Sequence, residues 1–346
     1  MDAAGELDLE ALTDALDGAV ARRPFTGLIA VDVGGQRVLE RCHGFAHRGL
    51  AVPVRPDTRF AVASGSKLFT ALALMRLVED GRLRLDGRVR DVLGADLPLI
   101  DDTVTIEQLL AHTSGIGDYL DEEADGDPAD FVLAAPVHTL TTAEAFLPLL
   151  DGFPQAFPPG ERFAYNNGAY VVLAIVVERV TGRGFHEVVQ ETVFGPAGMA
   201  SSGYPRLDEL PGDAALGYLL DDGDLVNTLR LPVRGSGDGG AFTTAVDLHR
   251  CWCAFDDGAV VSGATVAAMT EPRHDVPREA KRSGLGVFLN PAGQAWIIEG
   301  YDAGVSFRST YLPASRTTVS VLGNSSEGAW PAIHALAEVI DASTAG

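Results

Sequence analysis

Residues 64–78 read SGSKLFTALALMRLV, and the rest of the chain can be interpreted outward from this stretch. Apolar residues follow Lys67 at helical spacing, and no glycine or proline interrupts them before Gly81, so the sequence predicts a helix over this segment. Three residues of spacing on a helix place Ser64 and Lys67 on one face, about 5–6 Å apart at Cβ. Only Lys67 and Lys281 are lysines among the 26 basic residues, so the pair is unusual in this chain.

The side chains of Ser64 and Lys67 suit nucleophilic catalysis. A serine hydroxyl is a weak nucleophile until a neighbouring base takes its proton. A lysine can be that base when burial lowers its pKa, whereas an arginine keeps its proton. The alternative is a chance pairing of a serine and a lysine at the start of a helix. Taken alone, the pair therefore leaves both interpretations open.

A second candidate segment is Tyr165-Asn166-Asn167. A phenol next to an ammonium group ionises more easily and can relay a proton, which makes Tyr165 a candidate acid and base. The side chain of Asn167 can both orient a lysine and hold a substrate amide. The alternative is a buried tyrosine followed by a turn of asparagines.

The period of the apolar residues divides the chain into helical and extended segments. Thr105 with Gln108, and Thr141 with Glu144, have the spacing of helix capping boxes. The expected helices cover residues 8–22, 67–78, 105–110, 170–180, 185–193, 245–255 and 329–340. The expected strands cover residues 25–33, 37–45, 284–289, 295–300, 305–312 and 317–322.

Strands at both ends with helices between them predict an α+β fold. We expect an antiparallel β-sheet, closed by the two ends of the chain and flanked by the N- and C-terminal helices, together with a mainly helical lobe. Residues 1–346 would form a single catalytic domain. Its α/β lobe would comprise about residues 8–65 and 238–343, and its helical lobe about residues 66–237. A cleft between two such lobes is a favoured position for a ligand site.

The composition excludes several classes of function. The 346 residues carry a formal net charge of -22, which repels phosphate backbones and makes nucleic acid an unexpected partner. No stretch of about 20 apolar residues and no export signal is visible, so no membrane partner and a cytoplasmic location are expected. No metal or nucleotide motif occurs, and the three cysteines form no disulfide framework or metal spacing. We therefore expect no cofactor and no metal site.

Taken together, the motifs resemble those of the serine β-lactamase and penicillin-binding-protein superfamily. Ser64-x-x-Lys67 is followed about a hundred residues later by Tyr165-x-Asn167, as in that family. Further segments between residues 20 and 340 resemble family segments in the same order: His112-Thr113-Ser114-Gly115-Ile116, Pro159-Gly160, Phe194-Gly195-Pro196-Ala197-Gly198-Met199, and Gly239-Gly240-Ala241-Phe242-Thr243-Thr244 with Asp247.

The resemblance implies a mechanism through an acyl-enzyme. Ser64 would attack a carbonyl while Lys67 and Tyr165 exchange protons, and Asn167 would help to position the lysine and the substrate. The backbone N–H of Ser64 would be one oxyanion donor. A strand N–H near Tyr301 or Asp302 would be the other. The histidine of the His-Thr-Ser-Gly segment is a less favoured base, because in the family that segment is mainly structural.

The third motif of the family is altered in this chain. The family has a Lys-Thr-Gly or His-x-Gly triplet whose cation helps to recognise a substrate carboxylate. Here the corresponding segment is Glu299-Gly300-Tyr301-Asp302. Glu299 falls where the cation is expected, or Tyr301 does if the register is shifted by two residues. The cation is missing in either register.

The consequence depends on where Glu299 points. Facing the cavity, Glu299 would repel a carboxylate, favour a neutral substrate or one with a free amine, and raise the pKa of Lys67 if it lies close. Tyr165 would then be the better base. The alternative is that Glu299 faces solvent and has no part in the site.

The sequence therefore predicts a serine hydrolase that acts through an acyl-enzyme on an ester or amide of a small molecule or peptide. The catalytic residues would be Ser64, Lys67 and Tyr165, and the substrate-binding residues Asn167 and the segment 299–302. One alternative is a β-lactamase or D,D-carboxypeptidase. Another is a catalytically silent binding or sensing protein on the same fold. The acyl acceptor and the oligomeric state cannot be read from the sequence.

Overall fold

The computed structural model describes residues 7–23, 25–120, 132–276 and 279–344. The helices are α1 (Leu9–Arg22), α2 (Lys67–Glu79), α3 (Arg90–Leu93), α4 (Ile106–Leu110), α5 (Leu147–Leu150), α6 (Asn167–Thr181), α7 (Phe185–Val189), α8 (Ala245–Asp256), α9 (Gly263–Thr270) and α10 (Trp330–Thr344). The strands are β1 (Gly27–Val33), β2 (Gln36–His43), β3 (Phe45–His47), β4 (Val52–Pro53), β5 (Phe60–Ala61), β6 (Phe242–Thr243), β7 (His274–Val276), β8 (Lys281–Ser283), β9 (Phe288–Leu289), β10 (Trp296–Asp302), β11 (Val305–Leu312) and β12 (Thr317–Gly323).

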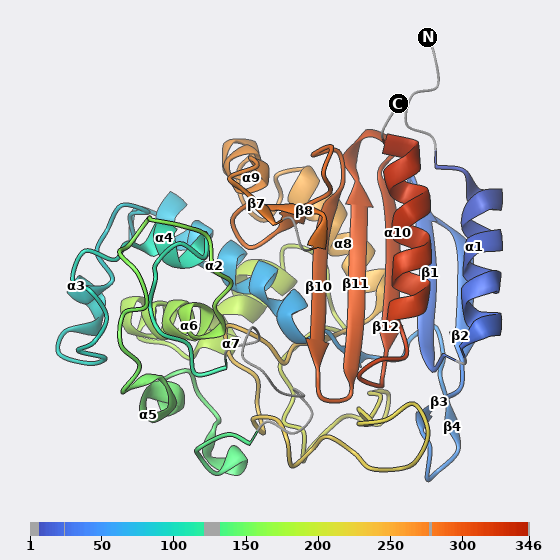
Figure 1. Cartoon of the computed structure of the whole chain (residues 1–346), viewed down its shortest axis with the longest axis horizontal. Coiled ribbons are helices and arrows are strands. Elements are labelled where there is room, and N and C mark those ends of the chain that lie inside the picture. The colour runs from blue at the N-terminus through green and yellow to red at the C-terminus, as the bar shows by residue number, and fades with distance from the viewer. Residues whose placement is uncertain (1–6, 24, 121–131, 277–278, 345–346) are drawn as a thin grey trace.

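Within the described residues, one antiparallel sheet of eight strands organises the molecule in the order β2-β1-β12-β11-β10-β9-β8-β7 (Figure 1). Strand β1, near the start of the chain, pairs with β12, near its end, from Gly27 opposite Gly323 to Val33 opposite Thr317. Strands β3 and β4, and strands β5 and β6, form two small separate pairs. The predicted α+β class and the closure of the sheet by both chain ends are therefore confirmed.

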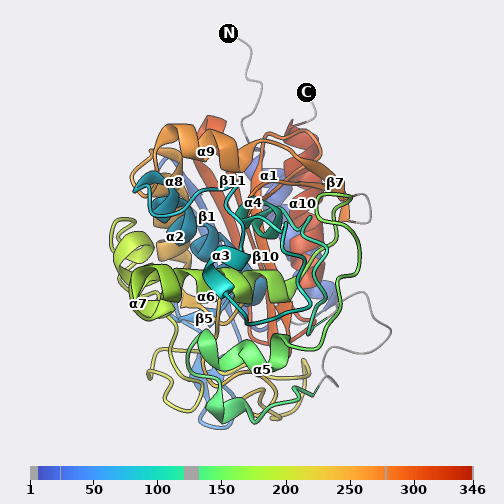
Figure 2. The ribbon, with the colours of Figure 1, turned by 90° about the vertical axis from the view of Figure 1, so that its left-hand side faces the viewer.

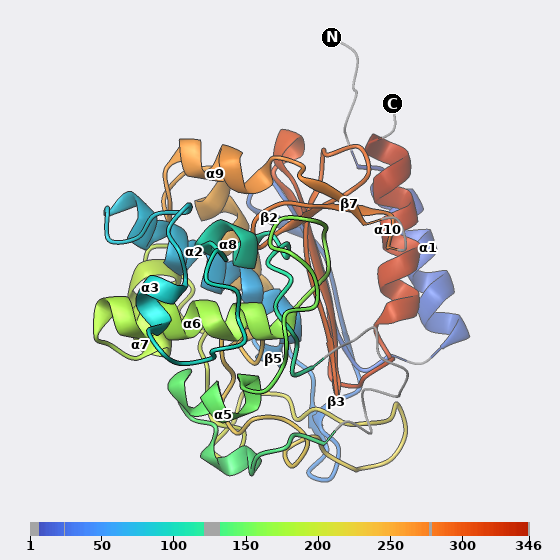
Figure 3. The same cartoon turned by 60° about the vertical axis from the view of Figure 1, so that its left-hand side comes forward.

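Helices cover both faces of the sheet (Figure 3). The terminal helices α1 and α10 pack together on one face, where Leu12, Leu16 and Leu336 join side chains of β1 and β12 in an apolar cluster. Helices α2, α6 and α8 lie on the opposite side, where a second and larger apolar cluster connects them to the sheet (Figure 2). The predicted flanking of the sheet by the two terminal helices is thus confirmed. The division into two lobes at residues 65 and 238 stays a prediction.

Several predicted elements need correction. The expected strand at 284–289 is interrupted because Gly286 has φ +74°, a left-handed conformation, so only Phe288–Leu289 is extended there. The expected capping box at Thr141 is absent, since the following turn begins at Glu144 after Ala143. The expected helix at 185–193 continues beyond Val189 as a π-helical turn over Gln190–Phe194.

The predicted limits of α4 and the predicted end of α6 are accurate, whereas α6 begins at Asn167, three residues before its predicted start. The capping box between Thr105 and Gln108 is present in both directions at the start of α4. Helix α6 ends at Gly182, whose φ of 70° forms a left-handed C-cap. Among the described residues, no helix is long and apolar enough to cross a membrane.

Candidate functional site

Ser64 lies in a 3-10 turn, η1 (Ala63–Ser66), directly before α2. Ala63 has φ +42°, a left-handed conformation that costs a residue with a Cβ on the order of 1–3 kcal/mol. Ser66 has a structural role, because its hydroxyl donates to the carbonyl of Ala63 at 2.7 Å and accepts the N–H of Ala241 at 3.0 Å. Ser64 instead lines a cavity, so it is the serine of this turn that a substrate can reach.

The amine of Lys67 lies within hydrogen-bond distance of three oxygen atoms. Its Nζ is 2.8 Å from the hydroxyl of Ser64, 2.8 Å from Oδ1 of Asn167 and 2.8 Å from the carbonyl of Asp238. Lys67 is 4% exposed, so these contacts are made away from bulk water. The structure thus brings the Ser64–Lys67 pair together with Asn167, which lies 100 positions after Lys67 in the sequence.

Tyr165 lines the same cavity as Ser64 and Lys67. The Lys67 Nζ lies 4.9 Å from the centre of its ring, and the ring stacks on His112 with 4.6 Å between ring centres. His112 is buried, and its Nδ1 accepts the N–H of Asn166 at 3.1 Å. Burial and, to a smaller extent, the charge of Lys67 lower the pKa of His112 to about 3. His112 is therefore a neutral packing residue that supports Tyr165.

The first turn of α6 holds Asn167 in place. Asp118 accepts the backbone N–H of Asn167 at 2.7 Å and that of Gly168 at 2.8 Å. Burial raises the pKa of Asp118 to about 6, although these N–H groups favour its charged form. The Nδ2 of Asn167 donates to the carbonyl of Leu120 at 3.0 Å. The oxygen of the Asn167 amide thus contacts Lys67 while its nitrogen is held by Leu120, which suits the expected role in orienting Lys67; its contact with a substrate stays a prediction.

Strand β10 runs along the turn that carries Ser64. Its ladder with β9 comprises Trp296 and Ile297, and the following residues lie next to η1. A Cβ added to Gly300 would be 2.2 Å from the carbonyl of Val62 and 2.8 Å from the amide nitrogen of Ser64, closer than packed atoms approach. Glycine at position 300 therefore allows the backbone of β10 to approach the amide of the nucleophile.

Glu299 faces the cavity, which is the first of the two positions considered from the sequence, but its charge is paired. It is 16% exposed on its side chain and lines the Ser64 cavity, so it does not point into solvent. It is also not a bare negative charge, because Lys281 of β8 donates to its Oε1 and Arg308 of β11 donates to its Oε2 at 2.7 Å. The carboxylate of Glu299 is thus paired with two cations, one from β8 and one from β11.

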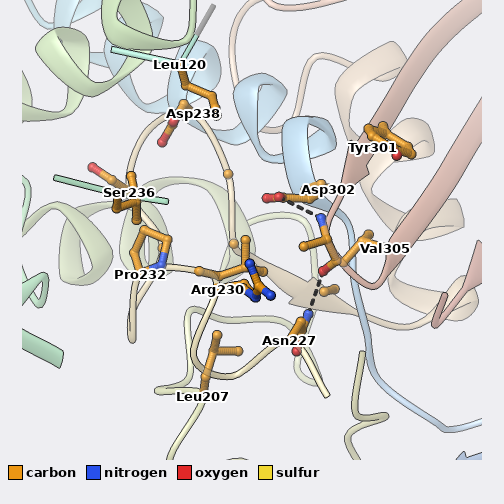
Figure 4. A pocket seen from close by; sticks show the side chains of 18 of the residues that line it. Leu120, Leu207, Asn227, Arg230, Pro232, Ser236, Asp238, Tyr301, Asp302 and Val305 are labelled. Atoms are coloured by element: carbon orange, nitrogen blue, oxygen red, sulfur yellow. Dashed lines mark hydrogen bonds between the residues drawn. The ribbon is translucent and has the colours of Figure 1, made fainter. Parts of the chain in front are cut away.

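Two cavities meet at Tyr301. The Ser64 cavity, of about 400 Å³, is lined by Ser64, Lys67, Tyr165 and the segment 299–301. A second cavity of about 210 Å³, here called the Arg230 cavity, reaches Ala63 beside the nucleophile and continues along Asp302 (Figure 4). Its walls are mainly apolar, with Leu120, Leu207, Leu231 and Phe242 among them. Asp302 also accepts the N–H of Ala303 at 2.8 Å.

The sequence interpretation missed four residues of this site. Asp118 and Asp238 lack a recognisable pattern, and Asp238 contributes a backbone carbonyl that any residue type could offer. Lys281 had been noticed as the second lysine but could not be placed, since its partner Glu299 lies 18 positions away. Arg308 is one of many arginines, and only the pairing of β10 with β11 reveals its position opposite Glu299.

Comparisons with known proteins show the family and the fold of the chain. A family model described as Beta-lactamase matches residues 12–343. A solved penicillin binding protein from Bacillus halodurans is 38% identical, with a TM-score of 0.86, and the match covers 94% of this chain and 99% of that chain. Esterase EstB of Burkholderia gladioli is 36% identical over 213 residues, which are 57% of this chain and 52% of the esterase.

A third relative is a D-aminopeptidase of Cereibacter sphaeroides. It is 31% identical over 216 residues, and the match covers 61% of this chain and 39% of the aminopeptidase. The chain thus spans about half of the esterase and about two fifths of the aminopeptidase. The solved D-amino acid amidase from Ochrobactrum anthropi SV3, at 22% identity and a TM-score of 0.78, shares the fold.

Proposed function

Because the chain belongs to the β-lactamase family of serine hydrolases, we propose that it forms an acyl-enzyme on Ser64 and cleaves an ester or amide of a small molecule or peptide. In this reaction the hydroxyl of Ser64 attacks the substrate carbonyl and the alcohol or amine leaves. Water or another acceptor then releases the acyl group from Ser64.

The position of the Lys67 amine is the observation that carries this proposal. Two oxygen atoms near the amine, Oδ1 of Asn167 and the carbonyl of Asp238, can only accept hydrogen bonds. The amine also donates to the hydroxyl of Ser64 at 2.8 Å, and once neutral it has a lone pair that can accept the proton of this hydroxyl. In this state Lys67 accepts the proton of Ser64 as the nucleophile attacks.

Tyr165 is proposed to carry the proton between Lys67 and the leaving group. Its ring lies beside the lysine and lines the cavity that contains Ser64. The backbone N–H of Ser64 and one N–H of β10 at Tyr301 or Asp302 are proposed to bind the developing oxyanion. The close approach of Gly300 to the Ser64 amide supports this arrangement, because it brings the two backbone segments together.

The two cavities suit a substrate with two parts. A scissile carbonyl at Ser64 leaves one part in the Ser64 cavity and the other in the Arg230 cavity, on either side of Tyr301. The apolar walls of the second cavity favour an apolar group there. An esterase and a D-aminopeptidase among the relatives cleave bonds of the two classes proposed here.

Hydrolysis of para-nitrophenyl acetate tests this proposal. Ser64→Ala should lose at least about a thousandfold in kcat, because the nucleophile is gone. Lys67→Arg should be similarly inactive, since a guanidinium keeps the charge but cannot accept a proton. Ser66→Ala is the matched control, in which we expect lower stability but most of the hydrolysis. Substantial activity in Lys67→Arg would refute the lysine as the base.

A further inference from the structure

Four charged side chains form one cluster where the Ser64 cavity borders a second groove; the two carboxylates line both, and the two cations line the second groove. The four are Glu279, Lys281 of β8, Glu299 of β10 and Arg308 of β11, here called the charge quartet. Lys281 donates to Glu299 and lies 2.6 Å from Oε2 of Glu279. Arg308 donates to the second carboxylate oxygen of Glu299 at 2.7 Å. Glu299 is therefore the residue that joins the two cations.

The quartet is buried to different degrees. The side chains of Lys281, Arg308 and Glu299 are 3%, 15% and 16% exposed, whereas Glu279 is 51% exposed. Two carboxylates and two cations give a formal sum of zero. Burial lowers the pKa of Lys281 to about 8 and that of Arg308 to about 10, so both remain cations at neutral pH. A buried cation is stable only when it is paired, and Glu299 supplies that pairing to both.

The charge quartet is continuous with the site of Ser64. Glu299 lines the Ser64 cavity and is followed directly by Gly300, which packs against the amide of Ser64. The ammonium group of Lys281 also lies 4.6 Å from the ring centre of Phe288, another residue of the cavity wall. A substrate group in this part of the cavity therefore meets the ring of Phe288 and the carboxylates of Glu279 and Glu299, whose cationic partners line the neighbouring groove.

We propose that Glu299 is a specificity-determining residue, which neutralises Lys281 and Arg308 so that the Ser64 cavity accepts an uncharged substrate group and disfavours a carboxylate. This inference rests on the proposed acyl-enzyme function. Recognition of a carboxylate needs a cation that faces the ligand, and here both cations pair with Glu299 and line the neighbouring groove instead of the Ser64 cavity. A carboxylate would lose its hydration without gaining a partner in return.

The test compares substrates that differ in one charge. The first pair, phenyl acetate and meta-acetoxybenzoate, varies the leaving group and forms the same acetyl-enzyme. The second pair, the para-nitrophenyl esters of pentanoic acid and of adipic acid as its monoester, varies the acyl group. The measured quantity is the ratio of kcat/KM for the neutral substrate to kcat/KM for the anionic one. The acyl group and the leaving group are proposed to lie in different cavities, so one of the two pairs places its varied group in the Ser64 cavity. Both pairs are therefore measured.

Three variants change the charge of the quartet in different directions. Glu299→Gln leaves one excess positive charge, and the ratio should fall roughly tenfold. Lys281→Gln leaves one excess negative charge, and the ratio should rise. The double variant is neutral again and should return the ratio to within about threefold of the native value. Glu10→Gln removes an exposed carboxylate on α1 that lines neither the Ser64 cavity nor the groove that contains Lys281 and Arg308, and the ratio should stay the same.

Two outcomes would overturn the inference. One is a ratio that does not respond to Lys281→Gln or to Glu299→Gln in either substrate pair. The other is a double variant that keeps the changed ratio of a single variant, because then packing rather than charge sets the preference. If Glu299→Gln alone fails to fold, Lys281→Gln and the double variant still decide the question. Failure of the proposed function is distinct, since the native protein would then form no acyl-enzyme with the neutral substrates.

Discussion

At the residue scale, the site depends on groups that hold Lys67 and Tyr165 rather than on reactive groups alone. Asn167 and the carbonyl of Asp238 fix two hydrogen bonds of the lysine amine. His112 lies between Tyr165 and Tyr170, with ring centres 4.6 and 5.0 Å away, and so sets the plane of the Tyr165 ring. Fixed orientation of this kind lowers the cost of reaching the transition state.

The buried state of His112 predicts how stability depends on pH. Its pKa is about 3 in the folded protein, against an ordinary value of 6.5 for a histidine side chain. The unfolded chain therefore binds a proton that the folded chain does not, and stability falls as the pH drops from about 6.5 towards 3, by up to about 1.4 kcal/mol per pH unit. His112→Phe removes this contribution. Urea unfolding measured between these pH values should show that the free energy of unfolding declines less steeply with falling pH in the variant.

Two details matter for that measurement. Asp118 has a raised pKa of about 6 and opposes the trend, because its protonated form is favoured in the folded state, but it does so equally in both proteins. His112→Phe also removes the acceptor for the N–H of Asn166, so its absolute stability is lower. Only the slope is compared, and equal slopes in the two proteins would contradict a neutral, buried His112.

At the scale of elements, the decisive contact is between β10 and the η1 turn. Gly300 is the point of closest approach, and a side chain there would push β10 away from the amide of Ser64. Displacement by about 1 Å can cost about a hundredfold in rate, because the oxyanion donors no longer converge. The spacing of these two elements therefore belongs to the catalytic geometry as much as the side chains do.

Gly300→Ala tests the role of this spacing. We expect kcat/KM for para-nitrophenyl acetate to fall about a hundredfold while the far-ultraviolet circular dichroism stays native. Gly263→Ala is the matched control, because a Cβ at that first position of α9 meets no atom within 4 Å. It should keep native activity. Full activity in Gly300→Ala would show that β10 can withdraw from Ser64 without loss of function.

Elements with a strong local signal were predictable, and contacts between elements were not. The C-terminal ends of α2 and α6 follow from unbroken apolar runs that stop before Gly81 and Gly182. The break at Gly286 depends on a single left-handed residue, which an apolar run does not reveal. The partners of Glu299 depend on the register of β10 with β11 and on the position of β8, which the apolar pattern does not specify. The site residues that belong to the sequence motifs could be predicted. The residues that reach the site only through the pairing of strands could not.

At the scale of the whole molecule, the sheet separates two apolar clusters that stabilise different parts of the chain. The cluster under α1 and α10 joins the two ends of the chain on one face. The larger cluster on the other face supports α2 and α6, which present Lys67 and Asn167 to each other. The sheet contributes β10 to the same site. The candidate site thus lies where segments from the beginning, middle and end of the chain converge.

The central claim is that Ser64 is the nucleophile of an acyl-enzyme. Intact-mass measurement after treatment with a fluorophosphonate probe tests it most directly. We expect the native protein to gain one probe mass on Ser64, and Ser66→Ala to be labelled as well. Ser64→Ala should show no labelling under the same conditions, while its circular dichroism remains native. An unlabelled native protein, or equal labelling of Ser64→Ala, would contradict the account.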